Sequence, residues 1–189
     1  MFSKKFIYIA GFITLFGLGG LGVALMYFFH DLTPYDIFLN GRHTIVLQLI
    51  FGSAYALLSM IILLSLLKRK LLDSTRYFFS DLLKKFRLNY AEIIFLSFCA
   101  GVGEELLFRG AIQSWLGIWL TAFIFILLHG YLNPRDKPLF IYGLVLFIIS
   151  AGFGYLMNYS GLLAAAIAHF WIDVGLMVYL KKQEMNLEQ

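Results

Sequence analysis

The chain of 189 residues alternates between long apolar stretches and short polar segments, a pattern typical of helices that cross a membrane. A spanning helix needs about 17 to 25 mostly apolar residues, because each residue adds about 1.5 Å of length. We expect a helix in each stretch of this length, the first being an uncleaved span. The stretches are residues 6–29, 44–67, 91–111, 115–131, 138–157 and 162–180.

Residues 71–90 follow a different pattern, because their apolar side chains recur on one side of a predicted helix. Charged residues take the opposite side. This pattern predicts an amphipathic helix, lying either in the membrane interface or as a connector packed on the bundle. The apolar residues are Leu71, Leu72, Phe78, Phe79, Leu82, Leu83 and Phe86, and the charged ones are Asp81, Lys84, Lys85 and Arg87.

Together these elements predict an all-α fold, a polytopic transmembrane bundle of about six spans with one interfacial amphipathic helix. We divide the chain into four parts. They are a two-span hairpin over 1–70, the amphipathic segment over 71–90, a four-span catalytic core over 91–182 and a flexible tail over 183–189.

Composition and charge agree with a membrane protein: 61% of residues are hydrophobic and 14% are charged, whereas soluble domains are about half apolar. The net charge of +4 does not point to nucleic acid, because the positive residues are placed asymmetrically. If both termini are cytoplasmic, every Lys and Arg except Arg42 and Arg109 lies on the cytoplasmic side. This bias predicts an N-in, C-in protein whose surroundings are lipid.

Ionisable residues inside the predicted spans are the candidates for chemistry. A charge near the bilayer centre costs about 2.5–3.5 kcal/mol on insertion scales, so such a residue normally persists because it has a function. Glu105 and Arg109 are four residues apart and can form an ion pair on one helix face. Glu104 lacks such a partner and is left available as a general base. The six candidates are Glu104, Glu105, Arg109, His129, His169 and Asp173.

His169 and Asp173 are also four residues apart, so the carboxylate can bond one ring nitrogen and fix the tautomer. Each polar group alone could have a structural role without catalysis. It could form a polar contact between helices, or, for a histidine, lie at the membrane interface. Because three spans carry such residues, we expect one shared buried site. One difficulty is depth: Glu104 lies about 20 Å along the third span, whereas His129 ends the fourth.

Several common chemistries lack their motifs in this sequence. There is no His-Glu-x-x-His of a zinc protease helix and no Gly-x-Ser-x-Gly elbow. Glycine patterns for ATP or a dinucleotide are also missing.

Glu104-Glu105-x-x-x-Arg109, Phe125-x-x-x-His129 and His169-x-x-x-Asp173 resemble, in this order, the three motifs of the CPBP family. That family comprises the type II CAAX prenyl endopeptidases and their bacterial relatives, also called Abi proteins, which are linked to bacteriocin processing and self-immunity. The resemblance covers about residues 91–180.

The resemblance implies a glutamate-type intramembrane endopeptidase. Glu104 and His129 would bind and deprotonate the attacking water, Glu105 would hold Arg109, and His169 with residue 173 would stabilise the oxyanion. The eukaryotic enzymes have Asn at the last position. Because an ionised Asp173 cannot donate a hydrogen bond, we expect it to orient His169 instead.

For this chain the resemblance implies a protein of the bacterial inner membrane that needs no cofactor. We expect its substrate to be a peptide or an anchored protein, not a prenylated one. Two alternatives remain open. The site could hold zinc through Glu104, His129, His169 and Asp173, or the chain could be a non-catalytic immunity or scaffold protein that binds a bacteriocin or a membrane partner.

Overall fold

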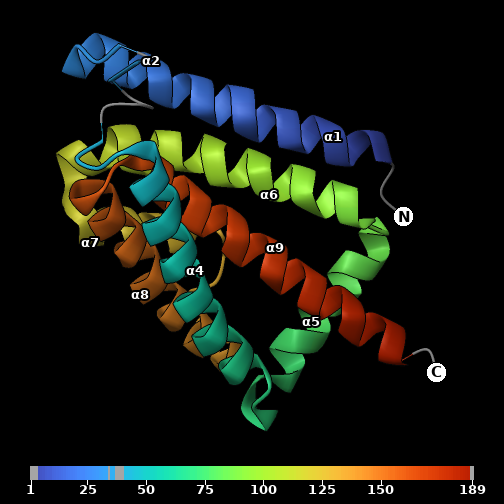
Figure 1. Ribbon diagram of the computed structural model, residues 1–189. Helices are drawn as coiled ribbons and strands as arrows, with labels where there is room; N and C mark the ends of the chain where they lie inside the picture. The colour runs from blue at the N-terminus through green and yellow to red at the C-terminus, as the bar shows by residue number, and fades with distance from the viewer. Residues whose placement is uncertain (1–3, 34, 37–40, 188–189) are drawn as a thin grey trace.

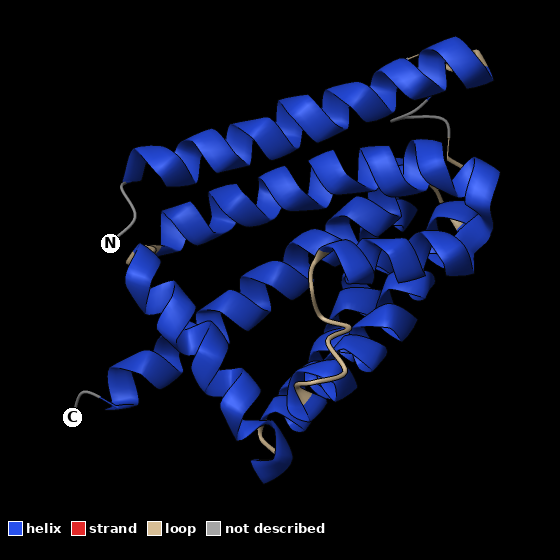
Figure 2. Cartoon of the chain, turned by 180° about the vertical axis from the view of Figure 1, so that it is seen from behind, coloured by secondary structure: helices blue, strands red, loops and turns tan. Residues whose placement is uncertain are grey.

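The computed structural model describes residues 4–33, 35–36 and 41–187, and all regular structure among them is helical (Figure 2). The all-α prediction is therefore confirmed. The helices are α1 (Lys4–Phe12), η1 (Ile13–Leu18), α2 (Gly19–His30), α4 (Ile45–Leu67), η2 (Lys70–Leu72), α5 (Asp73–Phe86), α6 (Tyr90–Glu105), η3 (Leu106–Ile112), α7 (Gln113–Leu128), α8 (Lys137–Tyr159) and α9 (Leu162–Leu187).

Within the described residues, five helices are long and apolar enough to cross a membrane, which identifies an integral membrane protein. This is close to the six spans expected, and the difference lies in one region. The expected third and fourth spans form one helical stretch, Tyr90–Leu128, which is interrupted at Gly117. The spanning stretches are Lys4–His30, Ile45–Leu67, Tyr90–Leu128, Lys137–Tyr159 and Leu162–Gln183.

Gly117 marks the point where the chain turns back into the bundle. Its φ of 72° and ψ of 172° lie in a region that essentially only glycine adopts. The helical part after it, residues 118–128, is about 16 Å long, which is too short to cross a bilayer. We call it the return helix. It runs antiparallel to α8, with Ile118 against Gly154 and Tyr131 against Gly143.

The first span, made of α1, η1 and α2, runs parallel to α6 and η3 (Figure 1). Lys4 pairs with Glu92 near the start of both helices, and Met26 contacts Gly110 near their ends. Close approach requires small residues along this seam. A Cβ on Gly22 would lie 2.6 Å from the carbonyl carbon of Leu106.

The second span, α4, packs along α9 and contacts α8. Gly52 of α4 lies against Ala164, and Met60 lies against Gly175, so α4 and α9 run in the same direction. The first two spans, which we expected as a hairpin, therefore pack mainly on different partners and flank the α6–α9 pair (Figure 1).

The amphipathic helix predicted within 71–90 is α5, and it packs on α8 and α9 as a connector. Leu72 before it is buried, and Phe79 packs against the bundle core. The Asp81–Lys85 ion pair lies on its exposed side. Phe78, expected on the apolar side, is 58% exposed.

Both described ends of the chain lie at the same end of the bundle (Figure 1). Lys4 donates a hydrogen bond to the Arg87 carbonyl, and the Lys181 ammonium lies over the Tyr90 ring. The tail expected over 183–189 is helical as far as Leu187, and residues 188–189 are outside the described part.

Candidate active site

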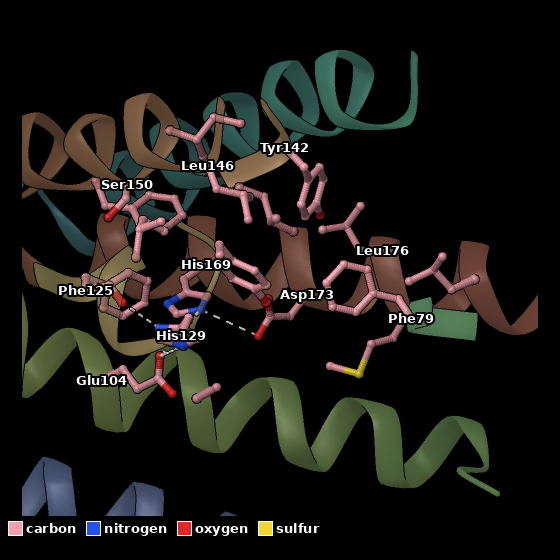
Figure 3. Close-up of a pocket in the computed structure, with 18 of the residues that line it drawn as sticks. Phe79, Glu104, Phe125, His129, Tyr142, Leu146, Ser150, His169, Asp173 and Leu176 are labelled. Atoms are coloured by element: carbon pink, nitrogen blue, oxygen red, sulfur yellow. Dashed lines mark hydrogen bonds and ion pairs between the residues drawn. The ribbon is translucent and has the colours of Figure 1, made fainter. Parts of the chain in front are cut away.

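The structure brings all six candidate residues together. Figure 3 shows Glu104, His129, His169 and Asp173 facing one another. The two glutamates end α6, Arg109 lies in η3, His129 follows the return helix, and His169 and Asp173 lie on α9. A cavity of about 300 Å³ is lined by Glu104, His129, His169 and Asp173.

A buried polar network lies beside this cavity, centred on Arg109, which is only 2% exposed. Arg109 Nη1 donates to Glu105 Oε1 at 2.9 Å, so the expected ion pair is present. Its Nη2 donates to the Ser150 hydroxyl and carbonyl at 2.6 and 3.0 Å. The guanidinium carbon is 4.5 Å from the Phe125 ring centre and 5.3 Å from that of Phe153. Hydrogen bonds, an ion pair and cation–π contacts therefore offset the cost of burying this charge.

His169 is held mainly by Glu105. Its Nδ1 lies 2.9 Å from Glu105 Oε1. Its Nε2 lies 3.5 Å from Asp173 Oδ2 and 4.0 Å from Glu104 Oε2, both longer than a direct hydrogen bond. We expected Asp173 to fix the ring by a hydrogen bond. In the structure the short contact is with Glu105, a residue far away in sequence. The ring also stacks on Phe153.

His129 reaches Glu104 because the return helix ends inside the bundle. This explains how the two residues share one depth, which we did not expect from two full spans. His129 Nδ1 lies 2.7 Å from the Phe125 carbonyl oxygen. Because a carbonyl can only accept, the neutral ring carries its proton on Nδ1. Its unprotonated Nε2 then faces Glu104 Oε2 at 3.6 Å.

Glu104 has surroundings unlike those of its neighbour Glu105. Its Oε2 is buried and accepts no hydrogen bond from the described residues. In the neutral form of His129, two acceptors therefore face each other across 3.6 Å. A water molecule beside this pair, within hydrogen-bond distance of both atoms, would satisfy both acceptors.

Sequence reasoning missed two side chains of the site. Ser150 bonds Arg109 across the bundle, and its only signal was a hydroxyl within the apolar run of α8. Tyr131 follows the return helix, lines the cavity and stacks on His129 with ring centres 5.7 Å apart. Burial raises the pKa of the Tyr131 phenol, so the group stays neutral and can donate a hydrogen bond.

No group of three or more His, Cys, Asp or Glu side chains that could hold a metal ion is found in the part of the chain that the structure describes.

The fold and the site define a class of protein: an integral membrane protein with carboxylates and imidazoles around one cavity. Residues 86–175, which include all six candidate residues, match the family model of the type II CAAX prenyl endopeptidase Rce1-like proteins. Over this region, just under half of the chain, the sequence is similar to that family, whose description names an endopeptidase and hence a hydrolase.

A curated relative is the uncharacterized protein YpbD of Bacillus subtilis (strain 168). It is 35% identical over 83 residues, which are 43% of this chain and 41% of the relative. The match thus spans about two fifths of the length of that relative. No solved structure matches the chain.

Proposed function

We propose that the chain is an intramembrane endopeptidase in which Glu104 and His129 activate the attacking water. The observation that carries this proposal is the 3.6 Å gap between Glu104 Oε2 and His129 Nε2. A water bound beside these two atoms would donate one hydrogen to each acceptor. Its lone pair is then free to attack a carbonyl carbon in the adjoining cavity.

The chemistry needs one proton to move twice. Glu104 takes a proton from the water while the water oxygen forms a bond to the peptide carbonyl carbon. The result is a tetrahedral intermediate whose former carbonyl oxygen is an oxyanion. The C–N bond then breaks, and Glu104 passes the proton to the leaving nitrogen. The products are a carboxylic acid and an amine, so the carboxylate returns to its starting form.

His169 is the proposed donor to the oxyanion. A ring that holds a hydrogen on both nitrogens donates Nδ1–H to Glu105 and turns Nε2–H towards the cavity. Such a donor, fixed before the reaction, is worth several kcal/mol. Glu105 and Arg109 are positioning residues, because they hold His169 and do not line the cavity. Asp173 supplies negative charge near Nε2.

We further propose that the protein lies in a bacterial inner membrane with both termini in the cytoplasm. Its substrate would be a peptide or a membrane-associated protein, with the bilayer as its surroundings. The family description names CAAX prenyl endopeptidases. The substrate of this chain can be identified by comparing the cleavage products of wild type and variant.

The experiment compares peptides and truncated proteins in membrane and medium from cells with wild type or Glu104→Gln, matched for membrane level. Glu92→Gln is the control, because it makes the same change on the same helix about 18 Å away. We expect products that are lost only in Glu104→Gln. Identical profiles for all three proteins would contradict proteolysis, and bacteriocin protection that persists in Glu104→Gln would point to a non-catalytic immunity role.

Metal analysis separates the glutamate mechanism from the zinc alternative. We expect less than one zinc per chain in purified protein, and cleavage of the identified substrate that persists with a chelator. Stoichiometric zinc together with loss of cleavage on chelation would overturn the metal-free mechanism.

A further inference from the structure

The position of α5 follows from the two spans that it connects. α4 is one spanning stretch and α6 begins the next, and α5 runs between their neighbouring ends (Figure 1). Because both ends of such a connector lie at the same membrane surface, α5, about 21 Å long, extends along that surface. Its outer side is therefore at the level of the lipid headgroups.

The chain enters α5 through three consecutive cations, Lys68, Arg69 and Lys70, which we call the basic turn. All three residues are exposed. Their side chains make no ion pair or hydrogen bond with any residue that the structure describes. The basic turn therefore presents positive charge that the described residues do not neutralise.

The acidic residues of α5 do not neutralise the basic turn, because they are paired within their own helix. Asp73 Oδ1 lies 2.7 Å from Arg76 Nη2, and Asp81 Oδ2 lies 2.7 Å from Lys85 Nζ. Arg76 also donates a hydrogen bond to the Leu67 carbonyl, which holds it against the end of α4. The charge of the basic turn thus remains available to an anion outside the protein.

Large apolar side chains are exposed beside the basic turn. Leu71 follows it directly and is 59% exposed, and Phe78, on α5, is 58% exposed. Tyr77 is half exposed, and the Arg76 guanidinium carbon lies 5.5 Å from its ring centre. Positive charge next to apolar and aromatic side chains is typical of a helix whose apolar side enters the boundary between headgroups and acyl chains.

The inner side of α5 forms part of the wall of the cavity that Glu104 lines. Phe79, Leu82 and Leu83 are the α5 residues in this wall. The Phe78 and Phe79 rings are in contact, with their centres 5.2 Å apart. A lipid on the outer side of α5 therefore touches the same helix that bounds the cavity.

We propose that the basic turn and the outer side of α5 bind anionic phospholipids of the surrounding bilayer. Lys68, Arg69 and Lys70 hold the phosphate groups, and Leu71 and Phe78 contact the upper acyl carbons. The charge selects this occupant, because each Lys or Arg near the membrane surface is attracted to anionic lipid. Phosphatidylcholine, which carries a positive choline group beside its phosphate, complements the basic turn less well. This inference goes beyond the proposed function and does not depend on it.

The first experiment uses a tryptophan on the outer side of α5 and lipids whose bromine atoms quench its fluorescence. Phe78→Trp is made in a chain whose three natural tryptophans, Trp115, Trp119 and Trp171, are replaced by phenylalanine. The protein is reconstituted in phosphatidylcholine, and brominated phosphatidylglycerol or brominated phosphatidylcholine is added in rising amounts. We expect phosphatidylglycerol to occupy the place beside the probe about threefold or more in preference to phosphatidylcholine.

Two variants of the basic turn separate charge from side-chain shape. Lys68→Gln with Arg69→Gln and Lys70→Gln removes the charge and should bring the preference to about one. Lys68→Arg with Arg69→Lys and Lys70→Arg keeps the charge and should keep the preference. Phe28→Trp makes the same exchange at an exposed position near the other end of the first span from Lys4, and there we expect a ratio of about one.

Three results would overturn the proposal. The first is equal quenching by the two lipids with the probe at position 78. The second is a preference that survives the glutamine exchanges. The third is no quenching by either lipid, because the outer side of α5 would then be covered by protein or water instead of lipid.

A second measurement needs no tryptophan exchange. Thermal unfolding of wild type in detergent is followed with phosphatidylglycerol, with phosphatidylcholine and with glycerol 3-phosphate, which carries the phosphate without acyl chains. We expect phosphatidylglycerol to raise the unfolding temperature more than phosphatidylcholine does, glycerol 3-phosphate to leave it unchanged, and the glutamine variant to lose this difference. An equal rise with both lipids, the same difference in the glutamine variant, or a rise with glycerol 3-phosphate would contradict lipid binding at the basic turn.

Discussion

At the scale of single residues, Glu104 and Glu105 are neighbours in sequence with opposite environments. Glu105 is fully buried and bonded to Arg109 and His169. Glu104 lines the cavity with an oxygen that accepts no hydrogen bond from the described residues. The first arrangement is that of a structural group, and the second is that of a group available for chemistry.

The two glutamates are therefore predicted to respond differently to the same exchange. Glu105→Gln leaves the Arg109 charge buried without its partner and should lower stability by about 3–5 kcal/mol. Glu104→Gln removes a carboxylate whose Oε2 accepts no hydrogen bond from the described residues, and should change stability little, while cleavage falls by about 10²–10⁴-fold. Unfolding in detergent and turnover of the identified substrate measure the two effects. Equal destabilisation by both exchanges would contradict the division of roles.

Arg109 is predicted to need its guanidinium as well as its charge. Lysine cannot reach Glu105 and Ser150 with a planar fork, nor stack between Phe125 and Phe153 in the same way. Arg109→Lys should lose at least one charged hydrogen bond, about 1.5–3 kcal/mol. Arg76→Lys is the control, because its pair with Asp73 is partly exposed and worth about 1 kcal/mol or less. Thermal unfolding of both variants tests the difference, and equal shifts would contradict it.

At the scale of helices, the close packing of the first span against α6 and η3 depends on glycines, which have no side chain. Gly22→Ala would place its Cβ 2.6 Å from the Leu106 backbone and should cost about 1–3 kcal/mol. Gly20→Ala meets nothing within 4 Å and should gain about 0.8–1 kcal/mol from helix propensity. Unfolding of the two variants in one detergent should therefore shift in opposite directions. A stabilising Gly22→Ala would show that the helices can separate without cost.

Much of this arrangement could be predicted from the sequence, because apolar length and i,i+4 spacing are local properties. They gave the long helices, α5 and the Glu105–Arg109 pair. The return helix could not be predicted in this way. Residues 115–131 are apolar enough to cross a membrane, and nothing in their composition reveals the positive φ of Gly117.

The partners of the site were also hidden from the sequence. Glu105 bonds His169 from 64 residues away, and Arg109 bonds Ser150 from 41 residues away. Such contacts depend on how α6, α8 and α9 pack together. The i,i+4 spacing of His169 and Asp173 pointed to the local partner, and the closer one came from another helix.

At the scale of the whole molecule, several positive charges lie near the chain ends. Lys4, Arg87 and Lys181 lie at the end of the bundle that carries both described chain ends. We predict that reporters fused at either terminus lie in the cytoplasm of a bacterial host. An alkaline phosphatase fused after His43 should be active in the periplasm. Enzymatic activity of phosphatase fused at either terminus would contradict this orientation.

The short return helix also has a consequence for biogenesis. A segment of about 16 Å is a poor signal for insertion on its own, so it must enter the bilayer together with α6 as one helical hairpin. This hairpin carries Glu104, Glu105, Arg109 and His129 into the bilayer in one step. The charges of Glu105 and Arg109 already neutralise each other within their helix. His169 of α9 joins them only after α9 has been synthesised, so the proposed site assembles late in translation.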